Sequence, residues 1–400
     1  MKKFKYRALK SDGNKFEGDY EAGTEEEVIK MIASSGAYPL KVEEITNNLN
    51  LSLSLFDKVK TKDLAVFCRQ FYSMIEAGLP IISALDILSN ESSNGKLRRI
   101  LGEIRDDVKK GENLSDSMKK YKDIFPKLLT SMVESGELSG NLDEMFLRMS
   151  VHFEKENKIN NKVKSALTYP MVIGVVAILA VLLIMIFVMP IFIGMFEEQG
   201  VTLPLITRML IGFSKFLTKN IIFVVIGLFG IIFAFKRYKN TENGILILSK
   251  LKLKIPIFKE LNKKVIVSRF TRTLATLVSS GVSLIHSLPI VASVLENKIA
   301  DDAIMKVRER VVKGEGLSGP ISEFDIFPKM LSSMIKIGEE SGSLDNILNK
   351  TADFYEDEVE QTIQTVTSLL EPLMIVLMGL VVGVIVLSII IPMFDMYGTM

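Results

Sequence analysis

The sequence has no tryptophan, one cysteine and two histidines among its 400 residues. A single cysteine cannot form an intramolecular disulfide, and so few cysteines and histidines cannot build a His/Cys metal cage. A glycine-rich phosphate loop, a paired His-carboxylate arrangement and a Ser/His/Asp pattern are also missing. We therefore expect no enzyme activity, no cofactor and no metal site. We interpret Cys68 as a small buried hydrophobe, and His152 and His286 as structural residues.

A strong charge of either sign is missing as well. The 49 basic and 47 acidic residues leave a net charge of +2, so no global field would recruit nucleic acid. Hydrophobic residues make up 48% of the chain and the mean hydropathy is +0.30, which indicates a membrane protein. Residues 1–7 are polar and basic and lack the apolar region of a signal peptide.

The chain contains an internal repeat. The stretch Met132–Asp143 (MVESGELSGNLD) recurs as Met334–Asp345 (MIKIGEESGSLD). Upstream, Asp123–Pro126 (DIFP) recurs unchanged as Asp325–Pro328. Downstream, each copy passes through a polar helical pattern into a long apolar one, in which two prolines also match: Pro170 with Pro372, and Pro190 with Pro392. We infer two copies of one membrane-tethered helical module.

The first residues form a separate module. Phe4, Tyr6 and Ala8 alternate with polar residues, as in a half-buried strand. A returning strand, a helix and a third strand from Leu40 complete a predicted ββαβ module over residues 1–45. We then expect a polar linker (46–60) and two cytoplasmic helical bundles, at 61–165 and 236–368. The fold class is a mostly α integral membrane protein.

Three segments can span a bilayer. Residues 165–196 and 372–394 carry no charge and are long enough for the roughly 20 residues that a span needs. A third, shorter candidate is residues 221–235. We predict spans at 166–196, 221–235 and 369–394, joined by an extracytoplasmic loop (197–220) and ending in an extracytoplasmic tail (395–400). Lysine and arginine flank the first two spans on one side, which predicts a multi-pass protein of the cytoplasmic (inner) membrane with a cytoplasmic N-terminus.

The repeated motif has several interpretations. We expect a helix to break at Gly136 and at Gly338, with the next glutamate in a turn that leads to a new helix. In the simplest interpretation, carboxylates and serines of the turn cap backbone N–H groups. The residues concerned are Glu137, Ser139 and Gly140 in the first copy, and Glu339, Ser341 and Gly342 in the second. Alternatives are an acidic docking surface, or a cation site at Glu134, Glu137 and Asp143.

Two further pairs of residues are candidates. Arg69 and Arg272 occupy equivalent positions, which suggests a repeated salt bridge to the turn carboxylates, or surface positioning. Tyr169 and Glu371 precede the matched prolines at the start of the apolar segments. An ionisable group there is a functional candidate, although Glu371 can also lie at the interface near a helix N-terminus that favours negative charge.

The duplicated Gly-Glu-x-Ser-Gly-x-Leu element, the Phe-Pro corner, Tyr169-Pro170 and the three-span layout resemble the PilC/GspF platform proteins of type IV pilus and type II secretion machines. The resemblance covers about residues 61–398. It implies six-helix cytoplasmic bundles that associate as dimers or higher oligomers in the membrane lipid. The implied partners are a hexameric assembly ATPase, prepilins and other pilus inner-membrane components.

The repeat departs from the family pattern at two places. Glu371-Pro372 replaces Tyr-Pro, and Lys336-Ile337 stands where the first copy has Glu134-Ser135. The two halves are therefore not expected to bind identical partners, and Tyr169 or Glu371 would meet a prepilin's N-terminal segment. The N-terminal module favours a type IV pilus platform. A secretion or competence pseudopilus is the alternative, and a transporter or a scaffold without a motor is a more distant one.

Overall fold

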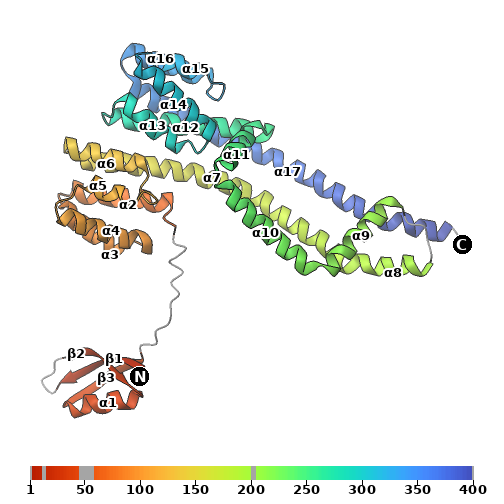
Figure 1. The fold of residues 1–400 in the computed structure, drawn as a ribbon, viewed down its shortest axis with the longest axis horizontal. Helices are drawn as coiled ribbons and strands as arrows, with labels where there is room; N and C mark the ends of the chain where they lie inside the picture. The colour runs from red at the N-terminus through yellow and green to blue at the C-terminus, as the bar shows by residue number, and fades with distance from the viewer. Residues whose placement is uncertain (1, 11–14, 45–57, 200–203, 399–400) are drawn as a thin grey trace. The chain divides into compact units, whose positions relative to one another are not determined.

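The computed structural model describes residues 2–10, 15–44, 58–199 and 204–398 (Figure 1). The chain divides into two compact units. Met1–Val59 with Ser92–Arg99 form one, and Lys60–Glu91 with Ile100–Met400 form the other. The described residues are mostly helical, as expected.

The N-terminal residues form a three-stranded antiparallel sheet with one helix. Its elements are β1 (Lys2–Lys10), β2 (Lys15–Ala22), α1 (Glu25–Ser34) and β3 (Ala37–Glu44), in the sheet order β2-β1-β3. Phe4 and Ala8 of β1 pack with Val28 and Ile32 of α1. The third strand begins at Ala37, earlier than expected, and includes Pro39. Proline is tolerated there because β3 is an edge strand.

Six helices follow one another in each copy of the repeat. The first copy has α2 (Thr61–Glu76), α3 (Ile81–Glu91), α4 (Gly95–Lys109), α5 (Leu114–Lys119), α6 (Lys127–Ser139) and α7 (Leu142–Leu183). The second has α12 (Pro256–Ser279), α13 (Leu284–Val294), α14 (Lys298–Val312), α15 (Ser318–Ser322), α16 (Lys329–Ser341) and α17 (Leu344–Gly398).

Phenylalanines form the centre of the first bundle. Phe67 and Phe71 lie one helical turn apart on α2, so both face the core. The Phe67 ring is 6.0 Å from that of Phe125, in the Phe-Pro corner, and the Phe71 ring is 4.2 Å from that of Phe146 on α7. In the second bundle the equivalent Phe270 and Phe327 rings are 5.6 Å apart. The repeated corner is therefore a core contact in both bundles.

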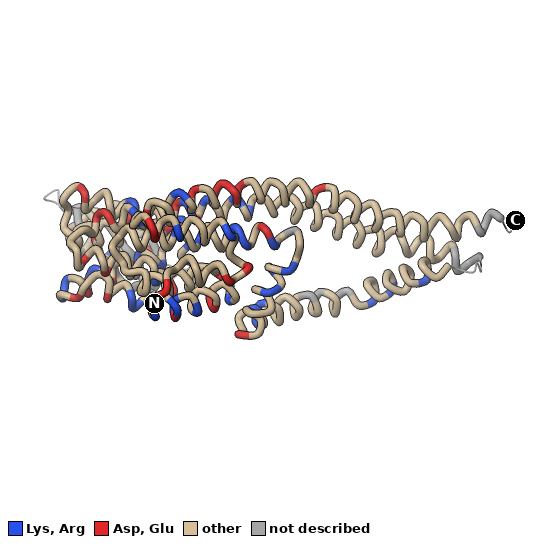
Figure 2. Tube along the Cα trace, turned by 90° about the horizontal axis from the view of Figure 1, so that it is seen from above, with Lys and Arg blue, Asp and Glu red and all other residues tan. Residues whose placement is uncertain are grey.

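Two helices are long and apolar enough to cross a membrane. One runs through α7, a π-helical turn η2 (Ile184–Val188) and α8 (Met189–Gln199), and the other is α17. Figure 2 shows their charged residues concentrated in the N-terminal parts. The π-turn directly precedes Pro190, which cannot donate a backbone hydrogen bond. Ser214 donates to the Met185 carbonyl in that turn, at 2.5 Å.

The segment predicted as an extracytoplasmic loop, residues 197–220, contains a helix, α9 (Leu205–Lys219). Its apolar face packs on both long helices. Leu217 clusters with Met185 and Ile385, and the Thr207 hydroxyl donates to the Ser388 carbonyl at 2.9 Å. The buried residues of α9 recur every three or four positions, a spacing that gives the helix one buried face and one exposed face.

The predicted middle span coincides with α10 (Ile221–Lys239). Helix α9 and α10 together pass the criteria for one span, but they are bent by 87° relative to each other. Figures 1 and 2 show α10 running back toward α11 (Glu242–Lys254), which precedes the second bundle. Two spans are therefore supported by helix length and composition, and a third crossing stays a prediction.

Candidate functional site

The repeated motif lies at the end of a helix that packs on the start of the next. The predicted break at Gly136 and Gly338 is wrong, because α6 and α16 continue to Ser139 and Ser341. Each helix ends at the second glycine of the motif: Gly140 has a φ of 75° and Gly342 a φ of 65°. Glycine adopts this left-handed conformation without steric cost, so it terminates the helix there.

The first glycine of each motif permits a close helix contact. A Cβ atom on Gly136 would lie 2.8 Å from Met145 Cγ and 3.1 Å from Leu142 Cα. On Gly338, it would lie 3.0 Å from the Cα of Leu344. Both glycines are buried. The missing side chain therefore lets each helix approach the backbone of the long helix that follows it.

The glutamates of the motif cap another helix. The carboxylate of Glu137 accepts hydrogen bonds from the backbone N–H of Leu114 (2.6 Å) and of Ser115 (3.1 Å), at the start of α5. Glu339 likewise accepts from Leu317 and Ser318, at the start of α15. The glutamate carboxylates thus cap backbone N–H groups, as the simplest interpretation expected, but at the start of an earlier helix. Glu137 therefore ties α6 to the start of α5, and Glu339 ties α16 to the start of α15.

The other interpretations of the motif find less support. Glu134 pairs with Lys119 at 3.1 Å, and both oxygens of Glu137 accept backbone hydrogen bonds. Among the described residues no group of three or more Asp, Glu, His and Cys is arranged to hold a metal ion. The predicted serine caps are wrong for the second copy, where the Ser341 hydroxyl hydrogen-bonds to that of Ser343 at 2.7 Å.

The two equivalent arginines do make equivalent salt bridges, but not to the turn carboxylates. Arg69 binds Glu154 of α7 through several hydrogen bonds of 2.9–3.1 Å. Arg272 binds Glu356 of α17 at 2.6 Å. Glu154 and Glu356 are themselves equivalent in the repeat. The predicted partner was wrong because a long guanidinium side chain reaches the neighbouring helix rather than the end of the bundle.

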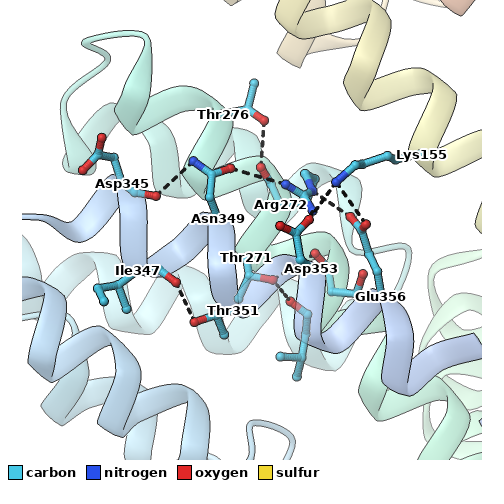
Figure 3. Close-up of polar contacts among 12 residues, drawn as sticks. Lys155, Thr271, Arg272, Thr276, Asp345, Ile347, Asn349, Thr351, Asp353 and Glu356 are labelled. Atoms are coloured by element: carbon cyan, nitrogen blue, oxygen red, sulfur yellow. Dashed lines mark hydrogen bonds and ion pairs between the residues drawn. The ribbon is translucent and has the colours of Figure 1, made fainter. Parts of the chain in front are cut away.

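Only the second of these bridges joins the two repeats (Figure 3). Lys155, from α7 of the first repeat, lies 2.8 Å from Asp353 and 3.3 Å from Glu356 of α17. Arg272 contacts the same two carboxylates, and it also donates to Asn349 at 3.3 Å. The side chain of Arg272 is 12% exposed and that of Arg69 is 40% exposed. We call these four residues of the second repeat, together with Lys155, the ionic junction: Lys155, Arg272, Asn349, Asp353 and Glu356.

The junction continues along α7 and α17 toward the apolar segments. Lys158 and Lys162 of α7 pair with Glu360 of α17. Beyond them, Val163 and Ala166 pack with the buried α17 residues Val359, Ile363 and Val366, in a cluster shared with α12. The basic flank of α7 thus pairs with Asp353, Glu356 and Glu360 of α17, while Glu358 pairs with Lys264 of α12. The two long helices are held together directly before they become apolar.

His152 of α7 is buried beside the ionic junction, and its Nδ1 has no hydrogen-bond partner within the described chain. Burial, together with the nearby charges of Arg272 and Arg269, lowers the pKa of His152 from 6.5 to about 4. A depressed pKa of this kind means that the folded state favours the neutral imidazole. The predicted structural role of His152 fits this position.

We expect His152 to make stability depend on pH. Because its folded pKa is depressed, its contribution is complete above about pH 6.5 and is lost as the pH falls toward 4. The loss between pH 7 and pH 5 should be about 2 kcal/mol. Melting curves of the detergent-solubilised chain at both pH values, for wild type and His152→Phe, measure it by difference. Equal curves for His152→Phe and wild type would contradict the assignment.

Tyr169 and Glu371 lie apart from the repeated motif. Both are exposed side chains, on the segments of α7 and α17 that lead into the apolar regions. The suggestion that Glu371 lies near a helix N-terminus is wrong, since α17 runs without interruption from Leu344 and contains Pro372. No helix dipole therefore accounts for a charge at this position, and a contact with another molecule stays a prediction.

The sequence of the chain resembles known proteins over both repeats and the N-terminal residues. The family described as "Type II secretion system (T2SS), protein F" matches residues 67–190 and 270–392, which correspond to the two repeats. The family's N-terminal domain matches residues 1–43. The chain is 35% identical to the type IV pilus assembly protein PilC of Myxococcus xanthus, over 99% of this chain and 95% of the relative.

Two other relatives show the range of the family. The type IV pilus assembly protein PilC of Thermus thermophilus is 35% identical, over 100% of this chain and 99% of the relative. The type II secretion system protein F of Pseudomonas aeruginosa is 30% identical, over 99% of each chain. With both repeats and the N-terminal domain matched, the chain belongs to the type II secretion system protein F family of membrane platform proteins, which includes the PilC proteins.

Proposed function

We propose that the chain is the cytoplasmic-membrane platform of a type IV pilus assembly machine. In this role it couples a hexameric cytoplasmic ATPase to the insertion of prepilins into a filament. The chain carries no catalytic constellation in its sequence, so the energy comes from the partner. A platform of this kind must carry motion from a soluble motor to subunits in the bilayer.

The observation that carries the proposal is the continuity of α7 and α17. Each helix begins inside a bundle, at Leu142 or Leu344, and continues into an apolar segment long enough to cross a membrane. The ionic junction clamps the two helices together before those segments. A displacement of either bundle is therefore transmitted along a stiff helix, and the clamp makes the two helices move together.

The choice of a pilus machine rests on similarity. Relatives named as type IV pilus assembly proteins are 33–35% identical to the chain, whereas those named as type II secretion system protein F are 28–31% identical. A secretion or competence pseudopilus is the second candidate. A transporter is disfavoured, because the buried hydroxyls of Ser388 in α17 and of Ser214 in α9 donate to backbone carbonyls rather than line a path.

The test is site-specific photocrosslinking in the native bacterium. Glu137 and Glu339 are unsuitable probe positions because they cap helices. Leu138, whose side chain is 86% exposed, and its repeat equivalent Glu340 are suitable for the cytoplasmic face. Tyr169 and Glu371 are suitable for the membrane face. We expect an ATPase from a cytoplasmic probe and a prepilin from a membrane probe. Capture of secretion pseudopilins would favour the second candidate, and capture of neither class would overturn both.

We further propose three membrane crossings, with the N-terminus in the cytoplasm and α10 as the middle crossing. Single cysteines introduced at Asn220 and Asn240, at the two ends of α10, test this arrangement. The natural Cys68 is fully buried and burial raises the pKa of its thiol well above the usual value, so it should stay unlabelled; Cys68→Ser provides the control background. In intact cells, a membrane-impermeant maleimide should label Asn220→Cys and not Asn240→Cys. Equal labelling of the two positions would show that α10 does not cross.

A further inference from the structure

A cavity of about 340 Å³ lies between four helices of the second unit, α7, α11, α12 and α17. Its walls are formed largely by aliphatic and aromatic side chains, among them Val163, Leu251, Phe258 and Val366. The volume is within the range of small-molecule sites. It corresponds to about eleven groups the size of a water molecule, at roughly 30 Å³ each. An unbranched hydrocarbon chain fits such a space, whereas a helix, about 10 Å across, does not.

The neutral polar side chains on the wall have no free donor for a ligand. Asn262 donates to the carbonyls of Lys252 (3.2 Å) and Phe258 (2.7 Å). The Thr367 hydroxyl donates to the carbonyl of Ile363 at 2.8 Å. These hydrogen bonds satisfy the donors within the chain, so the wall presents mainly carbon atoms to the cavity. An apolar ligand is therefore favoured over a polar one.

The cavity lies where the long helices change from charged to apolar. Val163 and Ala166 on its wall flank Lys164, the last charged residue before the apolar segment of α7. Helix α11 on the other side exposes Ile245, Ile247 and Leu251 beside three lysines, at 250, 252 and 254. Lysines whose ammonium groups reach water while aliphatic side chains beside them are exposed are favoured at a membrane–water interface. The cavity is thus at the depth of lipid headgroups.

A second cavity of about 390 Å³ adjoins the first and supplies positive charge. The two share Val163, Lys252 and Asn262 in their walls, and Lys164 lines the second. Arg269 and Glu296 also line it, but they pair with each other at 2.8 Å. Lys164 and Lys252 have no ion pair among the residues that the structure describes. Two unpaired ammonium groups beside an apolar cavity complement a molecule with an anionic head and a hydrocarbon tail.

We propose that the two cavities bind one anionic phospholipid, with an acyl chain in the first and the phosphate between Lys164 and Lys252. The lipid would contact α7 of the first repeat together with α12 and α17 of the second. It would therefore strengthen the contact between repeats just beyond the ionic junction. The site depends on the chain's position in a membrane, and not on whether the chain serves a pilus or a secretion machine.

Native mass spectrometry of the purified full chain tests the proposal, with phosphatidylglycerol and phosphatidylcholine as probes. We expect one phosphatidylglycerol to be retained per chain, at least tenfold more tightly than phosphatidylcholine. The double variant Lys164→Gln/Lys252→Gln should lose about tenfold in affinity. Lys250→Gln/Lys254→Gln removes the same charge from the same interface without touching either cavity wall, and should bind within twofold of wild type.

Several outcomes would overturn the proposal. Equal losses in the two double variants would show diffuse attraction to a basic surface rather than a built site. Equal retention of the two lipids by the wild-type chain would exclude selection by the phosphate region, and this comparison needs no variant to fold. A protein segment co-purifying in the cavity, crosslinked from Leu251, would show that the occupant is a partner and not a lipid. Ala166→Phe, which fills the first cavity, should reduce lipid retention while leaving the helical circular dichroism unchanged.

Discussion

Exchange of Arg272 for methionine should lower the free energy of unfolding by about 3 kcal/mol, near the lower end of the range for breaking a buried ion pair. The side chains of Arg272 and Glu356 are 12% and 15% exposed, so removing the cation leaves a carboxylate with little access to water. Lys155 compensates only partly, since it is 3.3 Å from Glu356 and nearer to Asp353. The melting temperature in mild detergent should fall by roughly 6–12 °C.

Arg69→Met is the matched control, because the repeat places Arg69 at the same position of the first bundle. Its bridge to Glu154 is exposed on both sides, at 40% and 47%, and no third charged residue within the described part of the chain joins it. Exposed ion pairs are worth about 0–1 kcal/mol, so the melting temperature should change by less than about 4 °C. Equal effects of the two substitutions would mean that the junction adds nothing to a surface bridge.

A second comparison isolates the contact between repeats. Lys155→Met removes the one junction residue contributed by the first repeat and leaves the Arg272–Glu356 pair intact. It should destabilise less than Arg272→Met, yet weaken the coupling of α7 and α17. A double-mutant cycle of Lys155→Met with Glu356→Gln measures that coupling directly. A zero interaction energy would remove the ionic argument for concerted movement of the two long helices.

Much of the fold follows from patterns that act locally. The spacing of Phe67 and Phe71 places both on one face of a helix. Residues 372–394 carry no charge, and this uncharged segment is long enough to span a membrane. The capping role of Glu137 is also a local chemical preference of carboxylates for backbone N–H groups. Its partner helix is not local, because Leu114 is 23 residues away, and sequence spacing carries no information on that contact.

The salt bridges show what a repeat can reveal when all its equivalent positions are compared. Arg69 and Arg272 are readily noticed as matched positions in the sequence. Their partners Glu154 and Glu356 also occupy matched positions of the repeat, but they are harder to notice because they lie among many other charged residues. The register of the repeat could have identified them. The register could not have identified Lys155, since its equivalent, Asp357, has the opposite charge. That contact exists only because the two repeats differ.

Charge pairing also accounts for the acidic residues that precede the apolar segment of α17. Glu356 and Glu360 pair with Lys155, Lys158 and Lys162 of the first long helix. Acidic residues contribute little to the positive-inside rule, so this flank by itself predicts no orientation for α17. The sequence shows both flanks but not that they meet.

The repeated glycines were misinterpreted because glycine serves two purposes. It can end a helix by adopting a positive φ, or it can remain helical and let another backbone come close. In each motif the first glycine remains helical and lets another backbone come close. The second glycine ends the helix with a positive φ. Gly136 lies in the last turns of α6 and Gly140 caps its end only four residues later, so local sequence does not distinguish them. The distinction depends on Leu142 and Met145, which fold back against Gly136.

Alanine at Gly136 or Gly338 should therefore destabilise the chain by about 1–3 kcal/mol each, as expected for overpacking. The added Cβ would lie 3.1 Å from Leu142 Cα in the first case and 3.0 Å from Leu344 Cα in the second. A backbone atom cannot rotate away as a flexible side chain can, so the two helices must separate. Because the sites belong to different bundles and share no contacts, the double variant should show the sum of the two effects.

Gly102→Ala is the control for intrinsic helix preference. Gly102 is also inside a helix, α4, but its added Cβ would meet only Ser89 Cβ, at 4.0 Å. Alanine should stabilise that helix by about 0.5–1 kcal/mol, so the melting temperature should rise where the motif variants lower it. The opposite signs separate close packing from helix propensity. If Gly136→Ala raised the melting temperature as well, α6 would not need its close approach to α7, and the repeated glycine would need another explanation.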